Sequence, residues 1–147
     1  MAENRIKMSR KMAVCIVLAV AAALFLIVIL TGIGQKDTNR KVENAEDAAA
    51  YLETLGWEVD PASVSTQNTV LPETFDKTLS AYNQLQLEQD FDLTAQAGRE
   101  ITIYTFSVLN YPNANGDVMA CLMTCKNRVI GGDIHSAAMD GFMHALK

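Results

Sequence analysis

The longest apolar stretch of the chain runs from Met12 to Leu30 and contains only Ala, Val, Ile, Leu, Met, Phe and Cys. At about 1.5 Å per helical residue it spans roughly 28 Å, close to the ~30 Å hydrocarbon core of a bilayer. Because the uncharged sequence continues to residue 35, we expect a transmembrane helix within residues 12–35. A polar tether over residues 36–43 and a folded domain over residues 44–147 should follow it.

Apolar spacing in the folded domain predicts an alternation of helices and strands. Ala48, Tyr51 and Leu55 recur at helical spacing, and Asn44 is a suitable N-cap, so we expect a helix over residues 44–55. The other expected elements are a weak strand over residues 64–71, a helix over residues 73–89, strands over residues 100–110, 118–125 and 129–135, and a last helix over residues 136–146.

The last three expected strands follow one another with little intervening sequence, which is typical of an antiparallel meander. The order of elements after the anchor is α-β-α-β-β-β-α. Helices outside a hairpin-linked sheet indicate an α+β fold rather than a doubly wound sheet. We therefore expect an α+β domain with a mainly antiparallel sheet and two to three helices. Gly131 and Gly132 should produce a bulge or a close backbone approach in the last strand.

The net charge of the chain changes sign at the apolar segment, from positive before it to negative after it. Residues 1–35 carry four Lys or Arg against one Glu, whereas residues 36–147 carry eight against sixteen acidic residues. Positive charge beside a membrane segment stays in the cytoplasm. We therefore expect a single-pass cell-membrane protein with a cytoplasmic basic segment over residues 1–11 and an extracytoplasmic C-terminal domain. The apolar run exceeds the core of a signal peptide, which favours an uncleaved signal anchor.

The net negative charge of the domain limits the kinds of partner that it can bind. The acidic domain has too few cations to bind nucleic acid, and its net charge should repel anionic lipid. Within the anchor, Ala19 and Ala23 have the small-xxx-small spacing that allows a helix-packed homodimer, although chance explains the spacing equally well in so alanine-rich a segment. Cys121 and Cys125 should lie about 13 Å apart on one strand face, too far for a disulfide, so we expect two buried or half-buried thiols.

Eight short pieces of the domain occur in a characteristic order. They are Tyr51-Leu52 with Leu55-Gly56-Trp57-Glu58-Val59, Leu71-Pro72-Glu73-Thr74-Phe75-Asp76, Tyr82-Asn83-Gln84-Leu85-Gln86, Phe91-Asp92-Leu93, Tyr104-Thr105-Phe106, Asn110-Tyr111-Pro112, Val129-Ile130-Gly131-Gly132-Asp133 and Asp140-Gly141-Phe142. Over residues 45–146 this set resembles the bacterial family called domain of unknown function 4830 (DUF4830). The resemblance implies a small single-pass membrane protein of Gram-positive anaerobes, and it implies no activity, cofactor or catalytic residue.

The residues closest to a reactive cluster lie near the C-terminus. Asp133 and His135 share a face of the last expected strand, and Asp140 and His144 are four residues apart on the last expected helix. Two imidazoles and two carboxylates are suitable ligands for zinc or another divalent metal. If the two pairs do not meet, Asp133 and His135 satisfy backbone groups, and the other two form a solvated helix pair.

No motif in the domain predicts a catalytic residue or a cofactor. We therefore expect a membrane-tethered extracytoplasmic binding module rather than an enzyme. The bilayer should be contacted through residues 12–35, and an unknown envelope protein, envelope polymer or small ligand through the domain. The alternative is a metal-dependent enzyme or metal-binding domain that uses the C-terminal Asp and His residues.

Overall fold

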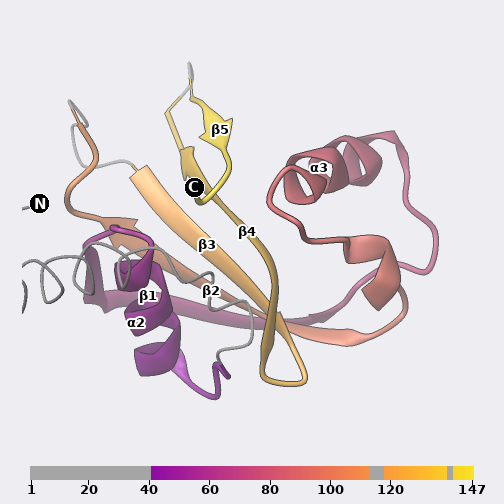
Figure 1. Ribbon diagram of the computed structural model, residues 1–147, viewed down its shortest axis with the longest axis horizontal. Coiled ribbons are helices and arrows are strands. Elements are labelled where there is room, and N and C mark those ends of the chain that lie inside the picture. The colour runs from indigo at the N-terminus through magenta and orange to yellow at the C-terminus, as the bar shows by residue number, and fades with distance from the viewer. Residues whose placement is uncertain (1–40, 113–117, 139–140) are drawn as a thin grey trace, which may run out of the picture. The chain divides into compact units, whose positions relative to one another are not determined.

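The computed structural model describes residues 41–112, 118–138 and 141–147. Its helical elements are α2 (Ala45–Thr54), α3 (Lys77–Leu87) and the short 3-10 helix η1 (Leu93–Gln96), and its strands are β1 (Val59–Val70), β2 (Glu100–Val108), β3 (Val118–Cys125), β4 (Arg128–Ser136) and β5 (Met143–His144). Every neighbouring pair is antiparallel, and the strands follow the order of the sequence across the sheet (Figure 1). The predicted α+β fold class and antiparallel sheet are confirmed.

None of the described residues forms a helix long and apolar enough to cross a bilayer. The expected cytoplasmic segment, residues 1–11, and the expected anchor, residues 12–35, with its small-residue spacing, lie outside the described part. The tether is described only from Lys41 onward. There Lys41 forms a β-bridge with Arg128 of β4, and Val42 is buried in the core. The folded domain therefore includes residues that the sequence assigned to the tether.

Local sequence signals explain both ends of α2. The Asn44 side chain accepts a hydrogen bond of 2.9 Å from the backbone N–H of Asp47, which satisfies one of the free amides of the first turn. Gly56 has a φ of +92°, which an L-residue with a Cβ rarely adopts, and the chain turns there towards β1. Ala48 and Leu52 are fully buried beneath the helix. The predicted helix, its cap and its closing glycine are confirmed.

The two helices pack on opposite faces of the sheet. On one face, α2 covers a core that includes Tyr104, Phe106 and Leu122. On the other face, α3 and η1 cover the end of the sheet that contains Ile101 and Met123. Because side chains alternate along a strand, β2 and β3 contribute to both cores. Among the described helices, α3 and η1 therefore cover one end of the second face.

The last predicted helix is wrong. Residues 143–144 form strand β5, in which His144 pairs with Ile134 and Met143 pairs with His135 of β4. At Gly141, a Cβ would be 2.7 Å from the carbonyl oxygen of Ala138. Glycine therefore fits the reversal between the two strands, and β5 supplies hydrogen bonds to an edge of β4 that a helix would leave unpaired.

Two other boundaries differ from the prediction. Helix α3 begins at Lys77 instead of residue 73, because Asp76 acts as its N-cap and accepts a 2.7 Å hydrogen bond from the Leu79 N–H. Strand β1 begins at Val59 rather than near residue 64, and its register with β2 shifts between Asp60 and Ser65.

Gln86 of α3 and Gln89, which lies just beyond its C-terminal end, hold the helix against β4. Gln86 Oε1 accepts a 2.8 Å bond from Gly132 N, and Gln89 Nε2 donates a 3.0 Å bond to Gly132 O. Gln89 Oε1 also accepts a 2.8 Å bond from Leu146 N. A Cβ on Gly132 would meet the carbonyl of Cys121 and lie 2.6 Å from Leu146 Cδ1. The close approach predicted from the glycine pair is confirmed, and the β4 register shifts beside it as expected.

Candidate functional site

A buried polar cluster is centred on Asp133 of β4, whose exposure is 2%. Tyr82 of α3 donates a hydrogen bond of 2.5 Å to Asp133 Oδ2, and His135 Nδ1 lies 2.6 Å from Asp133 Oδ1. An ionised carboxylate only accepts hydrogen bonds, so this contact assigns the Nδ1 proton to His135. Cys121 is the cross-strand partner of Asp133.

The surroundings of this cluster favour protonated hydroxyl and thiol groups. Burial, followed by the Asp133 carboxylate, raises the pKa of the Cys121 thiol to about 12. The same two causes raise the pKa of Tyr82 far above its usual value. A thiol with so high a pKa is a poor nucleophile at neutral pH. The cluster is therefore suited to holding α3 on the sheet, and the cysteine is not activated for covalent chemistry.

The structure brings together only part of the predicted metal site. Asp133 and His135 are in contact, as their positions on one strand predicted. His144 lies opposite Ile134, so its side chain is on the other face of the sheet. Asp140 lies outside the described residues. Within residues 41–112, 118–138 and 141–147, no three His, Cys, Asp or Glu side chains are grouped to hold a metal.

His144 instead belongs to an aromatic cluster at one end of the sheet. Tyr111 lies between two other rings: its centroid is 6.0 Å from that of Trp57, with 10° between the planes, and 4.9 Å from that of Phe142, with 20° between the planes. The His144 ring is 5.8 Å from Tyr111 and 5.6 Å from Phe142. We call Trp57, Tyr111, Phe142 and His144 the aromatic cluster.

Hydrogen bonds fix the rings of this cluster. Trp57 Nε1 donates a 2.7 Å bond to the carbonyl of Leu146. His144 Nδ1 lies 2.6 Å from the carbonyl of Ala145, which assigns that nitrogen as a donor, and in the neutral ring Nε2 then accepts from the Tyr111 hydroxyl at 3.2 Å. With both nitrogens engaged, His144 serves as a positioned ring rather than as a free metal ligand.

Asn110 connects the strand ends on which two of the rings are carried. Its Nδ2 donates a 2.8 Å bond to the carbonyl of Gly56, and its Oδ1 accepts a 3.0 Å bond from Glu58 N. The chain just before β1 is thereby tied to the chain just after β2. Trp57 and Tyr111, which are far apart in the sequence, are held side by side for this reason.

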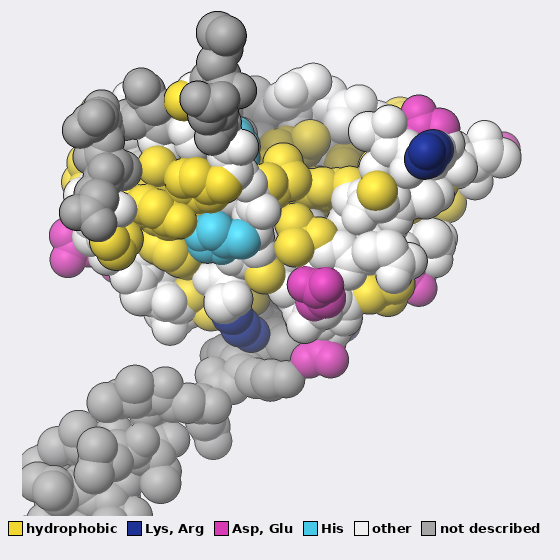
Figure 2. All heavy atoms as spheres, turned by 90° about the horizontal axis from the view of Figure 1, so that it is seen from above, with side chains coloured by type: hydrophobic (Ala, Val, Ile, Leu, Met, Phe, Trp, Pro, Cys, Tyr) yellow, Lys and Arg dark blue, Asp and Glu magenta, His cyan; other side chains and the backbone are white. Residues whose placement is uncertain are grey.

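Exposed apolar side chains occur at the same end of the sheet as the aromatic cluster, and Met143, which pairs with His135, lies on the opposite face of β5 from His144. Leu109 is 64% exposed, Met143 is 52% exposed and Phe142 is 37% exposed. These are three of the five large hydrophobic side chains found exposed within the described residues. Figure 2 shows hydrophobic side chains gathered around a histidine on the surface that is seen from above in the orientation of Figure 1. Contiguous apolar surface of this kind is typical of an interaction site.

A comparison with models of known protein families identifies the family of this chain. The family model of DUF4830, a domain of unknown function, matches residues 51–134, which is more than half of the chain. The chain belongs to the DUF4830 family. The match is narrower than the resemblance over residues 45–146, and it ends before β5. Searches of curated proteins and of solved structures find no match to this DUF4830 chain.

Several residues of the Asp133 cluster and of the aromatic cluster could not be recognised as site residues from the DUF4830 sequence alone. Tyr82 and Cys121 reach Asp133 only through α3 packing and the β3–β4 register. Trp57, Tyr111 and Phe142 belong to three separate pieces of the family resemblance, and the fold joins them in one cluster. Spacing along the chain could not reveal these contacts, since the residues lie on different elements.

Proposed function

We propose that this DUF4830 protein is a membrane-tethered extracytoplasmic binding module whose binding surface is the end of the sheet that carries the aromatic cluster, Leu109 and Met143. Residues 12–35 would anchor it as a single-pass protein with a cytoplasmic N-terminus. The observation that supports the binding role is the fixed set of rings, in which Phe142 is exposed, at the end of the sheet where Leu109 and Met143 are exposed as well. Aromatic residues and Met are enriched in protein interfaces, and rings held in place lose little conformational entropy on binding.

The position of the cluster suits a partner away from the tether. Lys41 lies at the Arg128 end of β4, whereas β5 and the aromatic cluster lie at the Ser136 end. Eight residues of strand separate those ends by about 26 Å. The binding surface and the point where the tether joins the domain are thus at opposite ends of the sheet.

The stacking favours a protein partner over a sugar. A sugar ring packs on the free face of an aromatic ring, but in the aromatic cluster Tyr111 has Trp57 on one side and Phe142 on the other. The exposed apolar side chains at this end of the sheet are Leu109, Phe142 and Met143. Such a surface fits the apolar side chains of an envelope protein.

A crosslinking pull-down from native membranes tests this proposal. The patch variant Leu109→Ser/Met143→Ser is compared with the control Val70→Ser/Leu87→Ser, which changes two other exposed apolar side chains. The proposal predicts that one envelope protein is recovered with the unmodified and control chains and lost with the patch variant. Equal recovery of every captured protein by the patch variant would reject the proposed surface.

Metal binding is the alternative function, and the contact between Asp133 and His135 favours it. A carboxylate that holds one nitrogen of an imidazole is a common partner of a metal-ligating histidine. The side chain of His135 is 30% exposed, so it would be the ligand. Zinc should then raise the Tm of the full-length chain, and His135→Gln, but not His144→Gln, should remove that rise. The absence of any zinc effect on the unmodified chain would exclude this alternative.

A further inference from the structure

The cations of the described domain are concentrated at one end of the sheet. Residues 41–147 contain six Lys or Arg against fifteen Asp or Glu, a net charge of −9. Four of those six cations lie around the β3–β4 turn and the start of β2. They are Lys41, Arg99, Lys126 and Arg128, which we call the basic end.

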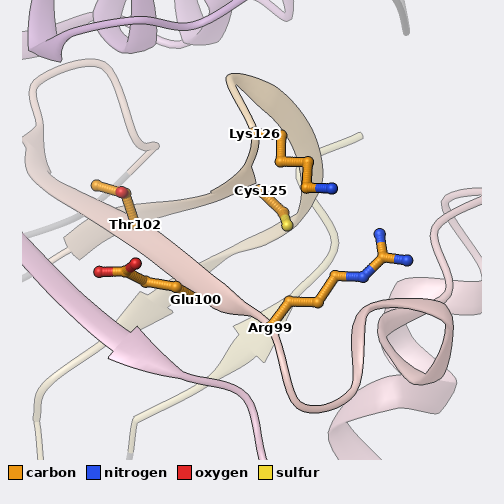
Figure 3. Close-up of a pocket in the computed structure, with 5 residues that line it drawn as sticks. All are labelled: Arg99, Glu100, Thr102, Cys125 and Lys126. Carbon is orange, nitrogen blue, oxygen red and sulfur yellow. The ribbon is translucent and has the colours of Figure 1, made fainter.

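Backbone contacts and a shared pocket place these four residues together. Lys41 forms its β-bridge with Arg128, and Val42 N donates a 2.9 Å bond to the carbonyl of Asn127 in the turn. Arg99 and Lys126 line one pocket of about 430 Å³ with Glu100, Thr102 and Cys125. Figure 3 shows the Arg99 guanidinium and the Lys126 ammonium extending towards the same side, while the Glu100 carboxylate lies on the opposite side.

No carboxylate of the described residues forms an ion pair with the cations of the basic end. Arg99 Nη1 donates a 2.8 Å bond to the uncharged Gln96 side chain. Among the described residues, the one ion pair found joins His135 and Asp133, and none involves the basic end. Exposed cations without carboxylate partners keep their attraction for an external anion. Glu43 and Glu100 are the nearest acids in sequence, and the Glu73 side chain lies beside Gly98. These three acids reduce the net charge of the four cations of this end without reversing its sign.

We infer that the basic end docks on the anionic phospholipid headgroups of the membrane that carries the anchor. This inference rests on the proposed anchor over residues 12–35. Only residues 36–40 separate that segment from Lys41, and five residues extend at most about 18 Å. The basic end is therefore confined near the lipid surface. Phosphate oxygens there are the complementary ligands for Arg99 and Lys126, which line the same pocket.

Docking of the basic end would also orient the proposed binding surface. With the basic end on the headgroups, the aromatic cluster at the opposite end of β4 would face away from the membrane. The domain's acidic remainder would be repelled by the same headgroups, which reinforces one orientation. The net negative charge alone predicts repulsion from anionic lipid, whereas the distribution of charge predicts oriented attachment.

Full-length protein in lipid nanodiscs tests the inference. Two reporter variants, in a background with Cys15→Ser, carry a fluorescent dye at Val70→Cys near the basic end or at Leu109→Cys at the far end. Val70 is a suitable site because it pairs with Glu100 and is exposed. Quenching of each dye by acrylamide, a neutral quencher, is compared between discs of phosphatidylcholine alone and discs that also contain phosphatidylglycerol.

The inference predicts that phosphatidylglycerol protects the dye at Val70→Cys and leaves the dye at Leu109→Cys unchanged. Each Lys or Arg at an anionic surface strengthens attachment roughly fivefold, so Arg99→Glu/Lys126→Glu should weaken docking on the order of 25-fold or more and remove the protection. The control Lys77→Glu/Lys147→Glu makes the same change in net charge and should keep it. About 1 M salt, at which the Debye length is about 3 Å, should also remove it.

Equal quenching in the two kinds of disc, or equal loss of protection in the two charge variants, would overturn the inference. Co-elution of the protein with both kinds of disc checks the anchor separately. A chain that co-elutes with neither would overturn the anchor and, with it, this inference.

Discussion

Replacing Tyr82 with Phe removes one hydroxyl from the Asp133 cluster and leaves the ring in place. The lost interaction is a 2.5 Å hydrogen bond between that hydroxyl and a carboxylate that is 2% exposed. Hydrogen bonds to charged groups contribute about 1.5–3 kcal/mol, and an acceptor left short of a partner in a buried site adds to the loss. We therefore expect Tyr82→Phe to lower the free energy of unfolding by about 2 kcal/mol.

Urea unfolding of the full-length chain in detergent measures this effect. Trp57, the single tryptophan of the chain, reports the transition by its fluorescence. For a typical m-value, a loss of about 2 kcal/mol lowers the midpoint by about 1 M urea. Tyr104→Phe is the matched control, because no hydrogen bond of the Tyr104 hydroxyl is found among the described residues and its ring is also buried.

A double-mutant cycle separates the hydrogen bond from general disruption. Asp133→Asn removes the charge, and the combined variant with Tyr82→Phe should be less destabilised than the sum of the two single variants. If Tyr82→Phe costs no more than the Tyr104→Phe control, or if the two changes are additive, the Asp133 cluster does not hold α3 on the sheet and the reasoning fails.

Three further predictions concern single residues. Because the folded-state pKa of Cys121 is about 12 against an ordinary 9.0, its contribution to stability is complete below about pH 9 and is lost as the pH rises towards 12. About 1.4 kcal/mol should be gone at pH 10, and thermal unfolding of Cys121→Ala should show a smaller alkaline loss; an unchanged loss would contradict this. Gly132→Ala should cost about 3 kcal/mol in urea unfolding, because its Cβ meets a backbone carbonyl, and Gly131→Ala should cost less, because the atoms 2.7 and 2.8 Å from its Cβ are side-chain ends; equal costs would refute that account. Asn110→Ala should lower the urea midpoint by the equivalent of about 1–2 kcal/mol through its two lost bonds, and a neutral result would show that it does not hold the strand ends together.

The parts of the fold that the sequence predicted are those controlled by neighbouring residues. Asn44 and Gly56 mark the ends of α2 through contacts within a few residues. The β3–β4 hairpin follows from two regular strands separated by a short turn. The alternation along β2 likewise assigned Ile101 and Tyr104 to different faces, and each is buried in a different core.

The last helix was mispredicted because a long-range interaction decides the conformation there. Residues 136–146 have enough helix-forming residues to suggest a helix, yet β4 offers a free edge, and pairing of His144 with Ile134 satisfies it. A single sequence contains no direct record of that pairing. The same limit applies to η1, whose Leu93 N–H is bonded to the side chain of Asn83 from α3.

The candidate sites likewise combine contacts that could be predicted from the sequence with contacts that depend on the tertiary fold. The contact between Asp133 and His135 was predictable because two positions separated by one residue share a strand face. Their further partners, Tyr82 and Cys121, depend on helix packing and strand register. The aromatic cluster depends on three connections at one end of the sheet, and the function proposed for it was not visible in the spacing of its residues.

Site-specific photo-crosslinking in the native membrane tests the binding surface most directly. A photoreactive residue is placed in the full-length chain at Leu109, Phe142 or Met143, and at the control positions Val70 and Leu87, all of which are exposed. The account predicts that the three patch positions capture the same envelope protein and that the controls do not. Capture of that protein equally from the control positions, or of no common protein from the patch, would contradict it.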